Sequence, residues 1–219
     1  MLDRLRPDGL TITPLLAAAA GRALAEHRAL VSRVLFGAAR PRRQVVVSIV
    51  VAVGEGDNLA VVRAGDADQK SVRAIDDELQ RGAERLRRGQ DADFEQSMRA
   101  VERTPMALLK PGLAATGWLS GALGLSNSAL GLHPDPLGSL CLSNIGGLGL
   151  DEAFSPPTPF AYAPVDLLVG SVADRPVVRD GAAAVRPCLT MNLTVDARVA
   201  SWSAVDAFAG GLRRHIAQA

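Results

Sequence analysis

The nine residues from Val45 to Val53 constrain the fold more than any other part of this chain. Their sequence, VVVSIVVAV, is almost wholly apolar and β-branched. Such a run is typical of a strand buried on both faces at the centre of a sheet, because side chains on either side of it must avoid water. A turn at Gly54–Asn58 and an apolar run at Leu59–Val62 predict a short return strand. The sequence therefore indicates a sheet covered by other layers.

Four segments have the helical spacing of apolar residues that could supply such a layer. Ser71–Arg88 is amphipathic, with charged residues opposite one apolar stripe. That stripe consists of Ile75, Leu79, Ala83 and Leu86. Thr13-Pro14 predicts the start of a second helix ending near Leu30, since a hydroxyl cap is followed by proline in the first turn. The other two helices are expected at Asp93–Arg103 and Ser203–Ile216.

The second half of the chain alternates short apolar runs with turns. Asp180-Gly181 lies midway in Arg175–Arg186 and predicts a tight β-hairpin, because both residues tolerate positive backbone angles. Asn144–Gly149, with the sequence NIGGLG, predicts a glycine loop. Further strands are expected at Ser139–Ser143, Val165–Val172 and Cys188–Val195. Together these elements predict an α/β fold, a mixed β-sheet flanked by helices.

The composition fits one globular domain and argues against several functions. The 219 residues, 48% of them apolar, suffice for one core, and we predict a single domain over 1–219. With 24 Lys and Arg against 23 Asp and Glu, the charge gives no reason to expect nucleic acid as a partner. No Cys/His cluster has metal-ligand spacing, so no metal is predicted. Cys141 and Cys188 lie in separate apolar runs, which favours buried thiols over a disulfide.

The N-terminus imitates a signal peptide only loosely. Arg4 and Arg6 precede the apolar stretch Leu10–Ala20, but Asp3 and Asp8 disrupt the basic region. The stretch fits a helix better, and no run of about 18 uninterrupted apolar residues predicts a membrane span. We therefore expect a cytoplasmic protein that does not cross a membrane.

The segment 106–125, MALLKPGLAATGWLSGALGL, is apolar, rich in glycine and interrupted by Lys110-Pro111. It lies within 104–138, which we interpret as a helical and loop insertion in the domain. Two hypotheses stay open for it: a helical hairpin packed inside the fold, or a surface that docks on a membrane or a partner. The packed hairpin is favoured, because the segment lacks the basic face that membrane-surface helices usually carry.

Three blocks resemble the catalytic domain of the dihydrolipoyl acyltransferases, the core enzymes of 2-oxoacid dehydrogenase complexes. Residues 47–79 resemble its strand, loop, strand and helix, without the usual Thr-Pro after Leu59. Residues 141–181 resemble its Thr-x-Ser-Asn-Leu-Gly loop, proline-rich turn and Leu-Val-Gly strand. Residues 191–216 stand where the family carries Asp-His-Arg-x-x-Asp-Gly. With the N-terminal helix, the resemblance covers about two-thirds of the chain.

The resemblance implies the chloramphenicol-acetyltransferase-like fold, which we expect to be truncated at its N-terminal edge. It also implies trimers whose active sites lie between subunits, with the serine of one chain facing the histidine of the next. We identify no lipoyl domain and no peripheral-subunit-binding domain in the sequence.

The family's catalytic motif is altered here. Its histidine is the general base that takes the proton from the acceptor thiol, a task suited to a group that titrates near neutral pH. This chain has Ala197 at that position, Ser201 at the position of the later acid, and Trp202 at the position of the glycine. Asp196 and Arg198 survive, and we interpret them as a structural ion pair.

The other half of the family's site is retained. Ser143 stands at the position of the serine that donates a hydrogen bond to the tetrahedral oxyanion, and it is the oxyanion candidate here. Asn144 beside it and Trp202 are the candidate substrate-binding residues. No covalently bound cofactor is implied, and coenzyme A is the one ligand that the family would bring.

The leading hypothesis is an acyltransferase-like protein that has lost most or all activity. It would serve as a scaffold or assembly subunit in a homotrimer or larger symmetric assembly, or complete half a site beside an active paralogue. The alternative is an active coenzyme A-dependent acyltransferase with a rearranged site, for which His133 is a candidate base. A further alternative is a membrane- or partner-docking module that uses 106–125.

Overall fold

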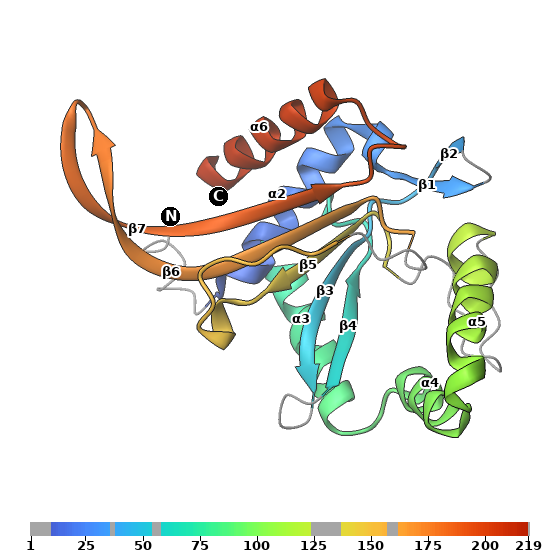
Figure 1. Ribbon diagram of the computed structural model, residues 1–219. Coiled ribbons are helices and arrows are strands. Elements are labelled where there is room, and N and C mark those ends of the chain that lie inside the picture. Colours follow the sequence, from blue (N-terminus) through green and yellow to red (C-terminus); the bar gives the residue numbers. More distant parts are fainter. Residues whose placement is uncertain (1–9, 36–37, 54–57, 124–136, 157–161, 219) are drawn as a thin grey trace.

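The computed structural model describes residues 10–35, 38–53, 58–123, 137–156 and 162–218. At its centre is a five-stranded sheet in the order β4-β3-β5-β6-β7 (Figure 1). The three central strands run parallel, and the edge strands β4 and β7 pair antiparallel with their neighbours. The strands are β3 Val47–Val53, β4 Asn58–Ala64, β5 Leu140–Asn144, β6 Val165–Arg179 and β7 Ala182–Val195. The predicted mixed α/β fold is confirmed.

Three helices, α2 (Ile12–Glu26), α3 (Val72–Arg87) and α6 (Trp202–Gln218), pack with the sheet around the hydrophobic core. Alternate strand residues such as Leu142 and Leu167 point into this core, where they join Ile75 of α3 and Phe208 of α6. The side chain of Ser71 caps α3 by accepting a hydrogen bond from the backbone N of Ala74 (3.1 Å). The helices predicted from apolar spacing are therefore present.

The opposite face of the sheet is more polar. Residues directly opposite one another on neighbouring strands share a face. Ser48, Cys141, Asp166 and Thr194 form one such row across β3, β5, β6 and β7. The predicted burial of β3 on both faces holds for its first three residues and fails after them, where Val50–Val53 is half-buried or exposed.

The strands β6 and β7 form one continuous hairpin that extends beyond the rest of the sheet (Figure 1). The predicted turn is confirmed, with positive φ at Asp180 (51°) and Gly181 (79°). Sequence reasoning divided this region into separate strands, whereas the pairing continues after an irregularity between Val169 and Val172. Near the tip, Val178 is 77% exposed, so the end of the hairpin lacks the cover that apolar strand residues usually have.

The segment after α3 comprises α4 (Ala92–Arg103), α5 (Met106–Gly117) and a π-helical turn at Trp118–Ala122 that continues α5. Phe94 of α4 packs against Ala60 and Val62 of β4, whereas α5 stands away from the sheet (Figure 1). The favoured prediction of a packed helical hairpin is wrong for the described part of 106–125. This part is one continuous helical rod, and Met106 is 83% exposed. The apolar composition predicts burial, and the described residues of the chain do not supply it.

Two smaller findings complete the fold. A separate two-stranded sheet, β1 (Ser32–Leu35) with β2 (Ala38–Pro41), was not predicted from the sequence. Cys141 is buried, Cys188 is half-buried, and both are free thiols. Among the described residues, no helix combines the length and apolar content needed to cross a bilayer.

Candidate active site

Ser143 lies near the end of β5, one residue before the strand ends. It is paired with Val50 of β3 on one side and with Leu168 of β6 on the other. These pairings place Ser143 on the polar face, the face that also carries Cys141. The side chain is half-buried, so its hydroxyl sits on a rigid strand at the edge of solvent.

The side chain of Asn144 ties the glycine loop to the N-terminal helix. Its Nδ2 donates to Thr13 Oγ1 (2.9 Å), and its Oδ1 accepts from the backbone N of Gly146 (3.0 Å). Thr13 therefore does not cap α2 as predicted: the helix starts at Ile12 after Thr11, and the Thr13 hydroxyl receives the amide of Asn144. Both polar groups of Asn144 are engaged within the chain, and its role in substrate binding stays a prediction.

Close backbone packing fixes the glycine loop against β6. A Cβ added to Gly170 would lie 1.9 Å from the carbonyl oxygen of Asp151, and one added to Gly146 would lie 2.8 Å from that of Gly170. The backbone N of Ile145 donates to the carbonyl of Val169 (2.9 Å) across the same junction. Only glycine permits this approach, so the loop after Ser143 has one well-defined position.

Asp196 and Arg198 form an ion pair directly after β7. The Arg198 guanidinium makes a two-point contact, with Nε 2.9 Å from Asp196 Oδ1 and an Nη 2.6 Å from Oδ2. The backbone N of Arg198 also donates to Oδ1 (3.0 Å). These hydrogen bonds hold the pKa of Asp196 below its usual range. The geometry agrees with a structural role, because the pair closes the turn that leads into α6.

The residues predicted to stand at the positions of the family's catalytic motif lie on the surface of this turn. Ala197 is exposed, and Ser201 Oγ lies 2.9 Å from Ser203 Oγ and accepts weakly from the backbone N of Ala204 (3.4 Å) at the start of α6. Trp202 is 86% exposed. Within one chain the indole therefore fills no cavity, and any effect on a substrate channel would require a neighbouring subunit.

Ser143 and Ala197 are not brought together within one chain. The residue of β7 in the same row as Ser143 is Asn192, which faces Leu168. β7 continues for three residues beyond Asn192, roughly 10 Å at the rise of a β-strand, and Ala197 lies in the turn after it. The two positions are therefore well separated within one chain, and a site using both would need two copies of the chain.

Comparison with solved structures identifies the architecture. The probable dihydrolipoamide acetyltransferase from Listeria monocytogenes 4b F2365 superposes with a TM-score of 0.69 at 20% identity, over 98% of this chain and 74% of that one. The cubic core of the pyruvate dehydrogenase multienzyme complex gives 0.64 at 22%, over 95% and 69%. A chloramphenicol acetyltransferase gives 0.52 at 12%, over 98% and 81%. The chain has the chloramphenicol-acetyltransferase-like fold.

This acyltransferase fold is recognised from structure alone. No protein-family model and no curated protein sequence matches the chain. At identities of 22% or less, the neighbours establish the architecture and leave the chemistry to the residues themselves. The predicted fold is thus confirmed, and the predicted site residues stay predictions.

Within the acyltransferase fold, sequence reasoning missed Asp166. It lies on β6 opposite Cys141, on the same face as Ser143. Burial raises the pKa of Asp166 to about 6, and the pKa of Cys141 rises to about 12 through burial and then through the charge of Asp166. Cys141 is therefore an inert thiol at neutral pH. The signal in the sequence was one acid inside the apolar strand VDLLVG.

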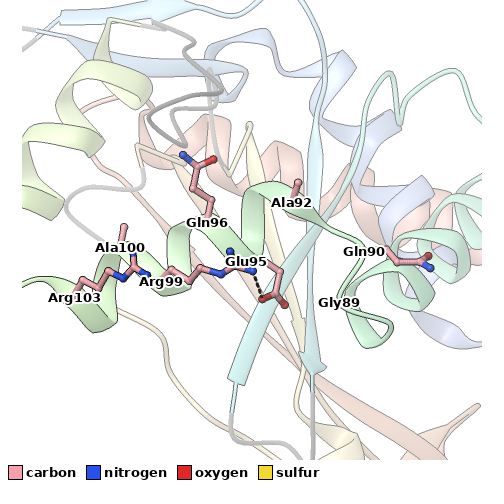
Figure 2. A pocket seen from close by; sticks show the side chains of 8 residues that line it. All are labelled: Gly89, Gln90, Ala92, Glu95, Gln96, Arg99, Ala100 and Arg103. Atoms are coloured by element: carbon pink, nitrogen blue, oxygen red, sulfur yellow. Dashed lines mark ion pairs between the residues drawn. The ribbon is translucent and has the colours of Figure 1, made fainter.

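Two grooves of the described chain lie away from both halves of the candidate site. One of about 630 Å³ runs along α4 (Figure 2), where Arg99 and Glu95 form an ion pair at 4.0 Å. A second of about 450 Å³ lies between β4, α3 and α4 and is lined by Val62 and Phe94. Neither includes Ser143 or Ala197. His133, the candidate replacement base, lies outside the described residues.

Proposed function

We propose that this chain is a subunit of a symmetric acyltransferase-type core in which base-catalysed acyl transfer has been lost. The observation that carries the proposal is the separation of Ser143, on β5, from Ala197, in the turn after β7, within one chain. In a closed ring of identical subunits, two such surfaces meet once at every interface. Each interface would then hold one oxyanion donor and one position where the base is absent.

The neighbouring structures support the assignment of these positions. The structure of the Azotobacter vinelandii dihydrolipoamide acetyltransferase was used to study three residues in the catalytic mechanism of that enzyme. They are a serine, a histidine 52 residues later, and an asparagine four residues after the histidine. Here Ala197 follows Ser143 by 54 residues, and Ser201 follows Ala197 by four. The spacing agrees to within two residues, so we carry the roles over to these positions.

The chemistry explains why the change would silence the site. An acceptor thiol with a pKa of about 8.5 is mostly protonated at neutral pH, and its thiolate is the nucleophile. The methyl group of Ala197 takes up no proton, and loss of a general base lowers a rate by roughly 10²–10⁴-fold. Ser143 could still stabilise an oxyanion. The assembly would therefore retain its scaffold and half of its catalytic apparatus.

Restoring the motif tests the proposal. We expect the Ala197→His, Ser201→Asp, Trp202→Gly variant to transfer acetyl between coenzyme A and dihydrolipoamide at least about 10²-fold faster than the natural chain. Ala207→His, which adds a histidine at another exposed position of α6, is the matched control and should gain nothing. A natural chain that already transfers acetyl rapidly, with no gain in the restored variant, would refute the proposal.

Mixing two inactive chains tests whether the site lies between copies. The restored variant carrying Ser143→Ala has a base without the oxyanion donor, and the natural chain has the donor without the base. After joint refolding, about a quarter of the interfaces of a random ring would pair the natural Ser143 with the new histidine. We expect activity in the mixture and in neither chain alone. A mixture that stays inactive contradicts an inter-subunit site.

One observation favours a second candidate, an active coenzyme A-dependent acyltransferase with a rearranged site. Asp166 is a half-buried carboxyl on the same face as Ser143, and its pKa of about 6 suits proton transfer near neutral pH. If this candidate is right, the rate of acyl transfer by the natural chain would fall as pH is lowered through about 6, because the base becomes protonated. Asp166→Asn would abolish the acyl transfer. An inactive natural chain that nonetheless folds and assembles removes this candidate.

A further inference from the structure

The helix α5 exposes apolar side chains to solvent on nearly all of its sides, which is unusual for a helix of a monomeric protein. Of its twelve residues, all but Leu109 and Gly117 are exposed, and Leu108 is 59% exposed. Its one charged residue is Lys110. A helix that is apolar on all sides is normally buried, because water is a poor solvent for every one of its faces.

One side of this helix forms a regular apolar seam. The seam residues are separated by three, one, three and three positions, the spacing at which side chains share a face of an α-helix. They are Leu108, Pro111, Gly112, Ala115 and Trp118, all of which are exposed. A Cβ added to Gly112 would meet no atom within 4 Å, so the centre of the seam is open.

The chemistry of the seam favours protein over lipid as its cover. A helix that lies on a membrane surface needs a polar face rich in Lys and Arg opposite its apolar face. On α5 that opposite face carries Lys110 alone among apolar neighbours such as Met106 and Leu113. Helix–helix packing requires no basic face, and small residues at the point of contact allow two helices to approach closely.

The seam is also complementary to itself. Its large side chains, Leu108 and Trp118, lie at the two ends, and the small residues Gly112 and Ala115 lie between them. In an antiparallel pair centred near Leu113, Leu108 of one copy lies beside Trp118 of the other, and the small residues face one another at the axis. Such a two-fold contact uses the same patch on both copies and leaves Lys110 outside it.

We propose that α5 is a contact between two copies of this chain, made through the seam about a two-fold axis. The position of the helix supports this. Figure 1 shows α5 on the side of the molecule away from the projecting β6–β7 hairpin, so the two surfaces are separate.

The mass of the full-length chain in solution tests the contact directly. We expect Leu108→Glu with Ala115→Glu to at least halve the mass measured by sedimentation or native mass spectrometry, because each two-fold contact would bury four added carboxylates. Lys110→Glu alters charge on the other side of the same helix and should leave the mass unchanged. Circular dichroism should be unchanged in both variants, since the substituted side chains are exposed.

A cross-link tests the geometry without relying on the charged variants. In the antiparallel pair, Gly112→Cys places two thiols near the axis, and mild oxidation should give a reducible dimer. Lys110→Cys should give little disulfide-linked dimer, because position 110 lies on the other side of the helix. A natural chain whose mass is unaffected by the seam carboxylates, or equal cross-linking at positions 110 and 112, overturns the proposal. A third result would also overturn the proposal: the natural chain binds phosphatidylcholine–phosphatidylglycerol vesicles, the seam carboxylates abolish this binding, and the mass in solution stays constant. These measurements require no acyl transfer, so they succeed or fail independently of the proposed function.

Discussion

Replacing Asp166 by Asn should stabilise this protein above pH 6 and leave its stability almost unchanged near pH 4. The carboxyl lies on the polar face between Cys141 and Thr194, and among the described residues it forms no hydrogen bond or ion pair. Burial is the cause of its raised pKa, which moves from 3.8 to about 6. The folded state therefore binds a proton more readily than the unfolded chain does.

The size of the effect follows from that shift. About two pKa units correspond to a ceiling of about 3 kcal/mol between the protonated and ionised forms. Because the carboxyl keeps part of its contact with water, screening lowers the expected cost to about 1–2 kcal/mol. The cost is absent below the unfolded pKa near 4, grows as pH rises toward 6, and is complete above it. Asparagine has a similar shape and no charge, so Asp166→Asn removes the cost.

Urea unfolding of both chains at pH 4, 6 and 7.5 measures this difference. We expect the gain in the free energy of unfolding to rise across the series to about 1–2 kcal/mol. Asp174→Asn, at an exposed position of the same strand, is the control and should show no such rise. A gain that is equal at all three pH values, or a loss at pH 7.5, would refute the reasoning and would mean that the carboxylate has a stabilising partner.

Two further substitutions test how the halves of the candidate site are held in place. Gly170→Ala should destabilise the chain by about 2 kcal/mol or more in thermal unfolding, because its Cβ would overlap the carbonyl of Asp151. Asp196→Asn should cost about 1 kcal/mol, because Asp196 is half-buried but the Arg198 guanidinium that pairs with it is largely exposed. Since the pKa of Asp196 is lowered, that small loss should be present at neutral pH and should disappear as pH falls below its folded pKa.

The parts of the fold that sequence predicted well are those in which local pattern and final packing coincide. The helix α3 has its cap at Ser71 and its apolar stripe facing the sheet, so spacing alone located it. The turn at Asp180-Gly181 was equally local, because its residue types suit the positive φ angles found there.

The errors arose where a neighbour decides the outcome. Apolar composition in 106–125 indicated burial, but composition does not say whether the cover comes from the same chain, and α5 lies exposed. The hydroxyl of Thr13 resembled a helix cap because its partner, Asn144, is 131 residues away. Asp166 was missed for the same reason, since its cross-strand position opposite Cys141 becomes visible only once the sheet is assembled.

The candidate site divides in the same way. Resemblance supplied the residue types at Ser143 and Ala197, whereas the strand register supplied the fact that they lie apart within one chain. This separation has a physical consequence for the proposed loss of the base. Ser143 is fixed by the glycine loop and β6, and the turn at Ala197 is fixed by Asp196 and Arg198. Because these supports consist of different residues, we expect that either half can change chemically while the other keeps its geometry. A chain without a proton acceptor can therefore still present an intact oxyanion half to whatever subunit lies beside it.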